Sequence, residues 1–306
     1  MSSQYFRFVA RDTQHRRSVL LEQLLARADG WVPVADWRAD AFRVIAPQAA
    51  MPAVAAALYV HRGDANAAWV CVATPVHYVA EMTSVRLAPD GMLGLTPAGA
   101  ETLAADFNRV WKDSGIRMTV AAGTSPACTA QLLCIFDRAL EVVTRDPEDV
   151  LGRHIEEFLP TGADSGRLRR LISETEMWLF EHAANRARTE LNLPAINGFW
   201  FWGGGAPIAS LPIVQGWAAG DDLFFNSFSV PRDDKFPGGV VAAACVPGSD
   251  QWHALESHWL RPAVEQLRAR RIAHLQISAA DRCFTVTARG LRRFWRRRKP
   301  WWESFE

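Results

Sequence analysis

The sequence has few of the features that mark secreted or zinc-binding proteins. Only five of its 306 residues are cysteines, and no two of them form a CxxC pair. Four of the five lie in apolar, strand-like stretches, where a free cysteine behaves as a small buried hydrophobic residue. This usage argues against a disulfide framework and a cysteine-based zinc site, and it fits a reducing compartment.

Long apolar runs are also missing. No window approaches about 18 consecutive apolar residues, the length that a membrane-spanning helix needs. The first 17 residues hold five charged side chains and no apolar segment of the kind found in secretory signals. We therefore expect a cytoplasmic protein without a membrane span.

The signatures of several enzyme classes are absent as well. The sequence contains no GxGxxG, GxxxxGK[ST], GxSxG or HExxH pattern. No histidine–aspartate cluster with metal-ligand spacing is visible, so we predict no cofactor and no metal site. The net charge of +1 gives no overall field that would favour nucleic acid.

Helical patterns are interspersed with short, mostly apolar strands along the chain. This order predicts an α/β fold with a mixed, largely buried sheet flanked by helices. We expect a single domain over residues 1–306, with a boundary between two lobes near residues 144–164, where charged residues, prolines and a glycine gather. The prediction places a strand at 67–73 that ends at Thr74-Pro75, a hairpin over 85–95, a helix over 96–114, a helix over 166–191 and a strand at 223–225.

The strongest local signal lies at 192–205, with the sequence NLPAINGFWFWGGG. Trp200 and Trp202 alternate with Phe199 and Phe201, so each pair faces one side of a strand. Three glycines at 203–205 permit close approach of the main chain to a ligand or to another backbone. This pattern indicates either an aromatic-walled pocket with backbone amides at its lip, or a buried strand followed by a tight bend.

The predicted helix at 166–191 carries polar residues at spacings of three and four, which places Glu174, Trp178, Glu181, Asn185 and Arg188 on one face. If Arg188 points toward the glycines, its guanidinium can hold a carboxylate or phosphate in a two-pronged grip. If the face is exposed, the same residues form a weak surface network.

Two further stretches are open to a functional and to a structural interpretation. His77 follows the first predicted strand and, with Glu81, has the chemistry of an acid–base pair, although a single histidine also serves as a structural hydrogen-bonding group. The tail at 289–299 mixes arginines with aromatics, which leaves contact with phosphates open. The same composition is typical of a terminal segment whose aromatics dock and whose arginines are solvated.

Several short motifs together resemble the RpfE-type regulatory protein family of proteobacteria, from about residue 67 to the end of the chain. They are Thr74-Pro75-Val76-His77, Glu174-x-Glu176-Met177, His182-x-x-Asn185-x-x-Arg188, Ile196-Asn197-x-x-Trp200-x-Trp202-Gly203-Gly204-Gly205 and Arg293-Phe294-Trp295-Arg296-Arg297. The chain departs from the family pattern at Thr74, where Asp is usual, at Glu176, where Gln is usual, and at Ala183-Ala184, where Pro-Val is usual.

The resemblance implies a regulatory protein without an established reaction. Some members are labelled as similar to cofactor-independent phosphoglycerate mutases, which implies an alkaline-phosphatase-like core. That chemistry would need a Ser or Thr nucleophile and two metal ions held by Asp and His clusters, which we do not find in the sequence. If the fold is related, the core is degenerate and its chemistry has been lost.

We therefore predict a regulatory protein that binds a small-molecule ligand or a protein partner through the surface around 174–205. The alternative is a metal-dependent, phosphoglycerate mutase-like phosphotransferase or phosphohydrolase. The predicted ligand-binding residues are His77, Glu174, Glu181, Asn185, Arg188, Asn197, Trp200, Trp202, Gly203, Gly204 and Gly205.

Overall fold

A computed structural model of the chain describes residues 2–10, 18–60, 66–121, 130–228, 238–245, 255–279 and 281–304. The chain divides into two compact units. The first is formed by both ends of the chain, Met1–Met51 and Pro212–Glu306, and the second by the intervening residues Pro52–Leu211. The seam that we expected near 144–164 lies inside the second unit. A single domain over residues 1–306 stays a prediction.

The first unit contains a six-stranded sheet with the order β2-β11-β10-β1-β9-β8. Its strands are β1 (Ser3–Ala10), β2 (Gly30–Pro33), β8 (Trp217–Gly220), β9 (Gly239–Cys245), β10 (His274–Ala279) and β11 (Arg282–Thr287). β10, β1, β9 and β8 run parallel, whereas β11 and β2 are antiparallel to their neighbours. This sheet is mixed, as predicted.

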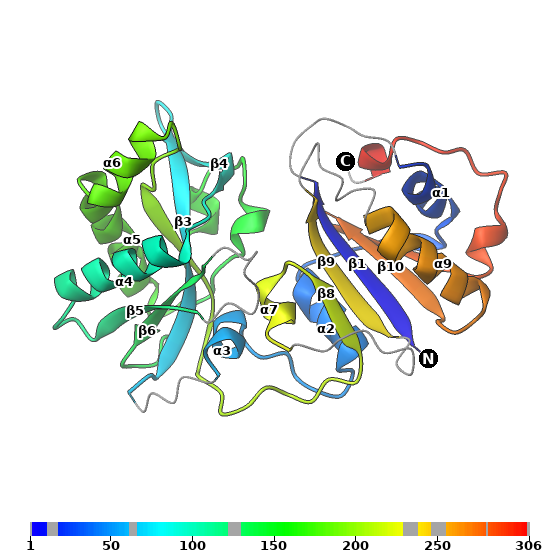
Figure 1. The fold of residues 1–306 in the computed structure, drawn as a ribbon, viewed down its shortest axis with the longest axis horizontal. Helices are drawn as coiled ribbons and strands as arrows, with labels where there is room; N and C mark the ends of the chain where they lie inside the picture. Colours follow the sequence, from blue (N-terminus) through cyan, green and yellow to red (C-terminus); the bar gives the residue numbers. More distant parts are fainter. Residues whose placement is uncertain are drawn as a thin grey trace. The chain divides into compact units, whose positions relative to one another are not determined.

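Helices cover both faces of this sheet (Figure 1). On one face, α1 (Val19–Arg27), a π-helix (Leu255–Leu260) and α9 (Arg261–Arg268) bury an apolar layer. On the other face, α2 (Trp37–Ile45) lies against β1 and β9. The strand predicted at 223–225 is wrong. These residues belong to α7 (Leu223–Asn226), because the Asp222 side chain caps a helical turn by accepting a hydrogen bond from the Phe225 amide at 3.1 Å.

The second unit contains an antiparallel sheet with the order β4-β3-β6-β5, and β7 pairs with β3. Its strands are β3 (Trp69–Ala80), β4 (Val85–Met92), β5 (Ile116–Val120), β6 (Leu132–Phe136) and β7 (Gly198–Gly205). Its helices are α3 (Val54–Tyr59), α4 (Pro97–Val110), α5 (Ser165–Phe180) and α6 (Ala183–Glu190), and 3-10 turns lie at Pro147–Asp149 and Glu156–Phe158.

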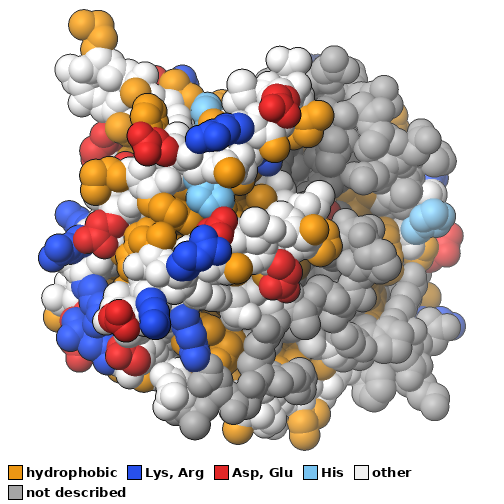
Figure 2. All heavy atoms as spheres, turned by 60° about the vertical axis from the view of Figure 1, so that its left-hand side comes forward, with side chains coloured by type: hydrophobic (Ala, Val, Ile, Leu, Met, Phe, Trp, Pro, Cys, Tyr) orange, Lys and Arg blue, Asp and Glu red, His pale blue; other side chains and the backbone are white. Residues whose placement is uncertain are grey.

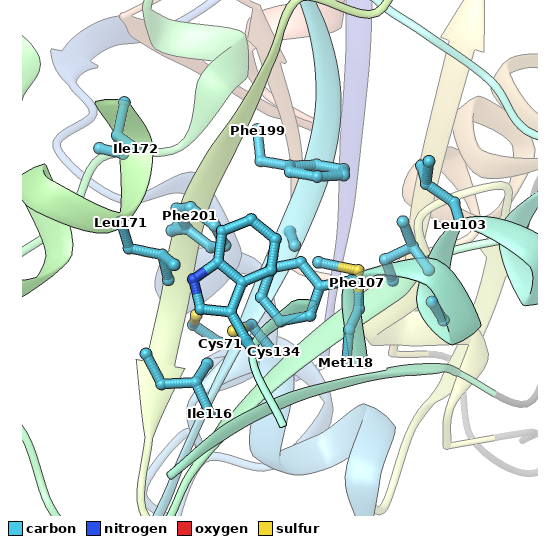
Figure 3. Packing of buried hydrophobic residues seen from close by; sticks show 14 of the residues in the cluster. Cys71, Leu103, Phe107, Ile116, Met118, Cys134, Leu171, Ile172, Phe199 and Phe201 are labelled. Atoms are coloured by element: carbon cyan, nitrogen blue, oxygen red, sulfur yellow. The ribbon is translucent and has the colours of Figure 1, made fainter. Parts of the chain in front are cut away.

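The main core of the second unit lies between one face of this sheet and helices α4 and α5. Figure 3 shows Phe199 and Phe201 of β7 meeting Phe107 of α4 and Leu171 and Ile172 of α5. All five side chains are buried. The alternation predicted for residues 199–202 is confirmed, because the two phenylalanines enter this core whereas Trp200 and Trp202 lie outside it.

Three predicted elements of the second unit are wrong in their bounds. β3 continues through Thr74-Pro75 to Ala80. Pro75 lies between the part of β3 that pairs with β6 and the part that pairs with β4, and its carbonyl points to this edge of the strand. Because neither partner pairs regularly at this position, the absence of an N–H group on Pro75 costs no regular hydrogen bond of the sheet. The 85–95 hairpin is one strand, β4, whose residues 88–91 form a bulge opposite His77.

The single helix predicted over 166–191 is two helices. α5 ends at Phe180, and His182 begins α6 as its N-cap, where its ring Nδ1 accepts from the Ala184 amide at 3.2 Å. The other ring nitrogen, Nε2, lies 3.2 Å from a carboxylate oxygen of Asp106 on α4. Because both ring nitrogens are engaged, His182 fixes the position of the break.

Candidate functional site

Four of the predicted site residues meet at the segment Pro194–Asn197, which joins α6 to β7. The His77 ring Nδ1–H on β3 donates to the Ala195 carbonyl at 2.8 Å. The Arg188 Nε–H on α6 donates to the Pro194 carbonyl at 2.7 Å. The remaining two, Asn185 and Asn197, also make side-chain hydrogen bonds in this region of the chain.

The two asparagines bind main chain as a neighbouring strand would. The Asn185 side chain accepts from the Ile196 amide at 2.8 Å and donates to the Ile196 and Leu179 carbonyls, both at 2.8 Å. The Asn197 side chain accepts from the Tyr78 amide at 2.7 Å and donates to its carbonyl at 2.8 Å. These amides satisfy backbone groups at irregular positions, which is a scaffolding role.

The two glutamates of the predicted set do not join this arrangement. Glu174 forms an ion pair with Arg170 at 2.8 Å, and the two side chains are 38% and 81% exposed. Glu181 is the exposed C-cap of α5. Because the helix breaks after Phe180, the predicted common face of residues 174–188 does not form. Trp178 packs instead against Phe107 at a ring-centroid distance of 6.0 Å.

The indole groups of Trp200 and Trp202 are buried and hydrogen-bonded. The Trp200 Nε1–H donates to the Arg145 carbonyl at 2.8 Å. The Trp202 Nε1–H donates to the hydroxyl of Thr74, also at 2.8 Å. Buried tryptophans usually find such acceptors. Their N–H groups are therefore committed to the fold.

The three glycines lie within β7, toward its carboxyl end, whereas Pro194–Asn197 precedes its amino end. Gly203 has a φ of +61°, and a Cβ there would lie 2.9 Å from Val54 Cβ on α3. A Cβ at Gly204 would lie 2.0 Å from the Trp69 ring. The glycines therefore let a helix and an indole ring approach the strand. The predicted ligand-binding set falls in two places along β7.

Other residues with functional character lie near the first of these places. Glu176 on α5 is half-buried, and burial raises the pKa of its carboxyl group. The Tyr78 hydroxyl is buried without a hydrogen-bond partner among the described residues. Burial, and secondarily the charge of Glu176, raises the pKa of Tyr78. Glu176 stood in a family motif, but its burial had no signal in the sequence.

Exposed apolar side chains are the clearest feature that the sequence analysis missed. Met177 and Phe180 on α5 are 70% and 85% exposed, and Leu191 and Leu193 after α6 are 69% and 47% exposed. We call these four residues the α5–α6 surface. The signal that could have found them is periodicity, because Met177 and Phe180 lie outside the buried stripe of α5 at Leu168, Leu171, Ile172, Thr175 and Leu179.

Basic and acidic side chains are interspersed on the face drawn in Figure 2. In the C-terminal tail, Arg293 pairs with Asp29 at 2.7 Å and donates to the Ala28 carbonyl, as Arg296 also does. These two arginines thus bind the end of α1, while Phe294 and Trp295 are exposed.

In the ranges that the structure places, no helix is both long and apolar enough to span a membrane. Within the same ranges, no group of three or more His, Cys, Asp or Glu side chains is arranged to hold a metal ion.

Comparisons with known proteins give a distant likeness. No family model matches the chain. The 2,3-bisphosphoglycerate-independent phosphoglycerate mutase of Methanothrix thermoacetophila is 30% identical over 87 residues, which are 28% of this chain and 22% of that protein. The match therefore spans about a fifth of the relative's length.

Two solved structures align over 94% of this chain, each with a TM-score of 0.38. They are the cofactor-independent phosphoglycerate mutase of Thermoplasma acidophilum, at 12% identity over 89% of that chain, and the PH0037 protein of Pyrococcus horikoshii, at 9% identity over 88% of that chain. The chain is a mixed α/β protein with a distant local similarity to phosphoglycerate mutase.

Proposed function

We propose that this chain is a cytoplasmic regulatory protein that binds a protein partner through the α5–α6 surface. The observation that carries the proposal is the exposure of Met177, Phe180, Leu191 and Leu193 within 17 residues of sequence. Large apolar side chains that are exposed to this degree are candidates for contact with a protein partner. The regulatory role implied by the family resemblance is part of the same proposal.

The hydrogen bonds of the candidate site favour a protein partner over a small polar ligand. Asn185, Asn197 and the Nε–H of Arg188 are bound to main chain. A small ligand would have to compete with these contacts, whereas a protein partner can use the apolar groups that remain outside them. The scaffold of Pro194–Asn197 then serves to hold α6 and its following loop against the sheet.

A photo-crosslinking experiment in cells tests the proposal. We expect the substitution Phe180→p-benzoylphenylalanine to give one adduct of discrete mass, and the same substitution at Val110 to give none. Val110 is the matched control because it is an apolar helical residue that is 58% exposed, on α4. The adduct should weaken at least tenfold in the presence of Met177→Asp, since burying a methionine side chain is worth about 1.5–3 kcal/mol.

The result that contradicts the proposal is equally specific. Met177→Asp should leave the unfolding free energy within about 0.5 kcal/mol, because the side chain is largely exposed. Equal crosslinking at Phe180 and Val110, or an adduct that persists with Met177→Asp in a folded protein, would show that the α5–α6 surface does not select a partner.

The local similarity to phosphoglycerate mutase favours a second candidate function. It is a metal-dependent phosphotransferase or phosphohydrolase, and the 87 matched residues are the observation that supports it. The donors that two metal ions need are not grouped among the described residues, so we derive no reaction step through them. Turnover of p-nitrophenyl phosphate with added Mn²⁺ would support this candidate, and a rate equal to that of the buffer would oppose it.

A further inference from the structure

The sheet of the first unit has two faces of different character. The face under α1 and α9 is apolar, with Phe6, Leu275 and Ile277 buried in it. The face under α2 carries polar side chains on three adjacent strands. Because β1 pairs with β10 and β10 with β11, these residues lie side by side: Ser3, Tyr5 and Arg7 on β1, Gln276 and Ser278 on β10, and Cys283 on β11. Two of these side chains satisfy each other, because the Arg7 guanidinium donates to the Ser278 hydroxyl at 3.3 Å.

A cavity of about 350 Å³ lies between this face and α2. Its polar lining comes from Ser3, Gln276 and Cys283 of the sheet and from Asp40 and Arg43 of α2. Val32, Val44 and Pro47 supply apolar walls. This volume is at the lower end of the range found for small-molecule sites, about 300–1,000 Å³, and therefore suits a ligand with a single ring.

Ser3 and Gln276 present partly exposed polar side chains to the cavity. The Tyr5 hydroxyl is buried close by, beside Ser278 and Cys283 of the neighbouring strands. Tyr5 itself does not line the cavity, but it pairs with Gln276, which does. A ligand that carries hydroxyl groups can therefore exchange hydrogen bonds with the Ser3 hydroxyl and the Gln276 amide.

The charges at the cavity balance. Asp40 and Arg43 form an ion pair at 2.5 Å, with side chains 36% and 68% exposed. Burial, followed by the charge of Asp40, raises the pKa of the Cys283 thiol to about 11, so the thiol is protonated at neutral pH. The lining therefore presents a hydroxyl, an amide and a thiol, each of which both donates and accepts, together with the ion pair of Asp40 and Arg43.

We propose that this cavity binds a small uncharged molecule rich in hydroxyl groups, of the size of a monosaccharide. Hydroxyl groups both donate and accept, and they match the lining without needing a counter-ion. The C–H faces of a sugar ring match the walls formed by Val32, Val44 and Pro47. The site lies in the first unit and is independent of the α5–α6 surface.

Alkylation of Cys283 by iodoacetamide, followed by peptide mass spectrometry, reports whether the cavity is occupied. The probes are D-glucose, D-galactose, D-mannose and D-ribose, with cyclohexanol and inorganic phosphate as apolar and anionic comparisons. The reaction is run at pH 9, where a larger share of the thiol is ionised. We expect at least one sugar to slow alkylation at least threefold with a saturable dependence on concentration, and cyclohexanol and phosphate to have no effect.

Two variants and one internal control make the outcome specific. Gln276→Leu and, separately, Ser3→Ala should each raise the sugar concentration that gives half-maximal protection by at least threefold. Cys71, buried in the core of the second unit, should react at a rate that no probe changes. Protection by cyclohexanol equal to that by sugars, protection by phosphate, or no protection by any of the four sugars overturns the proposal.

Discussion

Replacing Trp202 with alanine is expected to lower the unfolding free energy of the second unit by about 3–5 kcal/mol, the usual cost of truncating a large buried aromatic side chain. The Trp202 side chain is 7% exposed, and its Nε1–H donates to the Thr74 hydroxyl at 2.8 Å. The truncation leaves a cavity and also removes the donor to a buried hydroxyl. The chain has two units, so the stability of the second unit should be measured by itself. Hydrogen exchange of the β3 and β7 amides, which belong to that unit, provides this measurement.

Two controls separate the packing of Trp202 from its hydrogen bond. Trp202→Phe should cost less than alanine, because a phenyl ring fills much of the space of the indole, although the N–H and part of the ring are lost. Trp295→Ala should change stability by less than about 0.5 kcal/mol, since that side chain is 67% exposed. If Trp202→Ala left the exchange of β3 and β7 unchanged, the side chain would not be needed for packing, and the wall of a ligand pocket would be the better interpretation of it.

Local patterns predicted the elements whose boundaries are fixed by nearby residues. The helix expected over 96–114 is α4, and Thr96 caps it through the Gly99 amide at 3.1 Å, as expected. The alternation of phenylalanine and tryptophan in β7 is confirmed for the same reason, because side chains of a strand alternate whatever the strand's partners are. Caps and periodicity act over a few residues, so a single sequence contains them in full.

Elements whose bounds depend on distant partners were not predicted. Pro75 was expected to end a strand, but β3 continues because Pro75 lies where its edge partner changes from β6 to β4. The break at His182 depends on the carboxylate of Asp106, which is 76 residues away in the sequence. No pattern in the sequence around 166–191 records that contact.

The candidate site shows the same division. His77, Asn185, Arg188 and Asn197 belong to the predicted ligand-binding set, and in the structure all four contact residues 194–197 or β3 next to them. The sequence could not show that their polar groups are bound to main chain. Whether an amide binds a ligand or a carbonyl depends on the backbone it meets after folding. The ligand-binding role of these residues stays a prediction.

Replacing Gly204 with alanine is expected to lower the unfolding free energy of the second unit by about 1–3 kcal/mol or more, the cost of overpacking a well-filled site. An added Cβ would lie 2.0 Å from the Trp69 ring, and that ring is buried against Phe136 at a centroid distance of 5.3 Å. Trp69 can therefore give way only by moving its neighbours. Hydrogen exchange of the β3 and β7 amides provides the measurement here as well.

The matched control is Gly166→Ala near the start of α5, where an added Cβ meets nothing within 4 Å. Alanine should stabilise that helix by up to about 1 kcal/mol, so the same chemical change should have opposite signs at the two positions. If Gly204→Ala were as well tolerated as Gly166→Ala, the bare main chain of β7 would not be needed for packing. A glycine kept free for the approach of a bound molecule would then be the better account of residues 203–205.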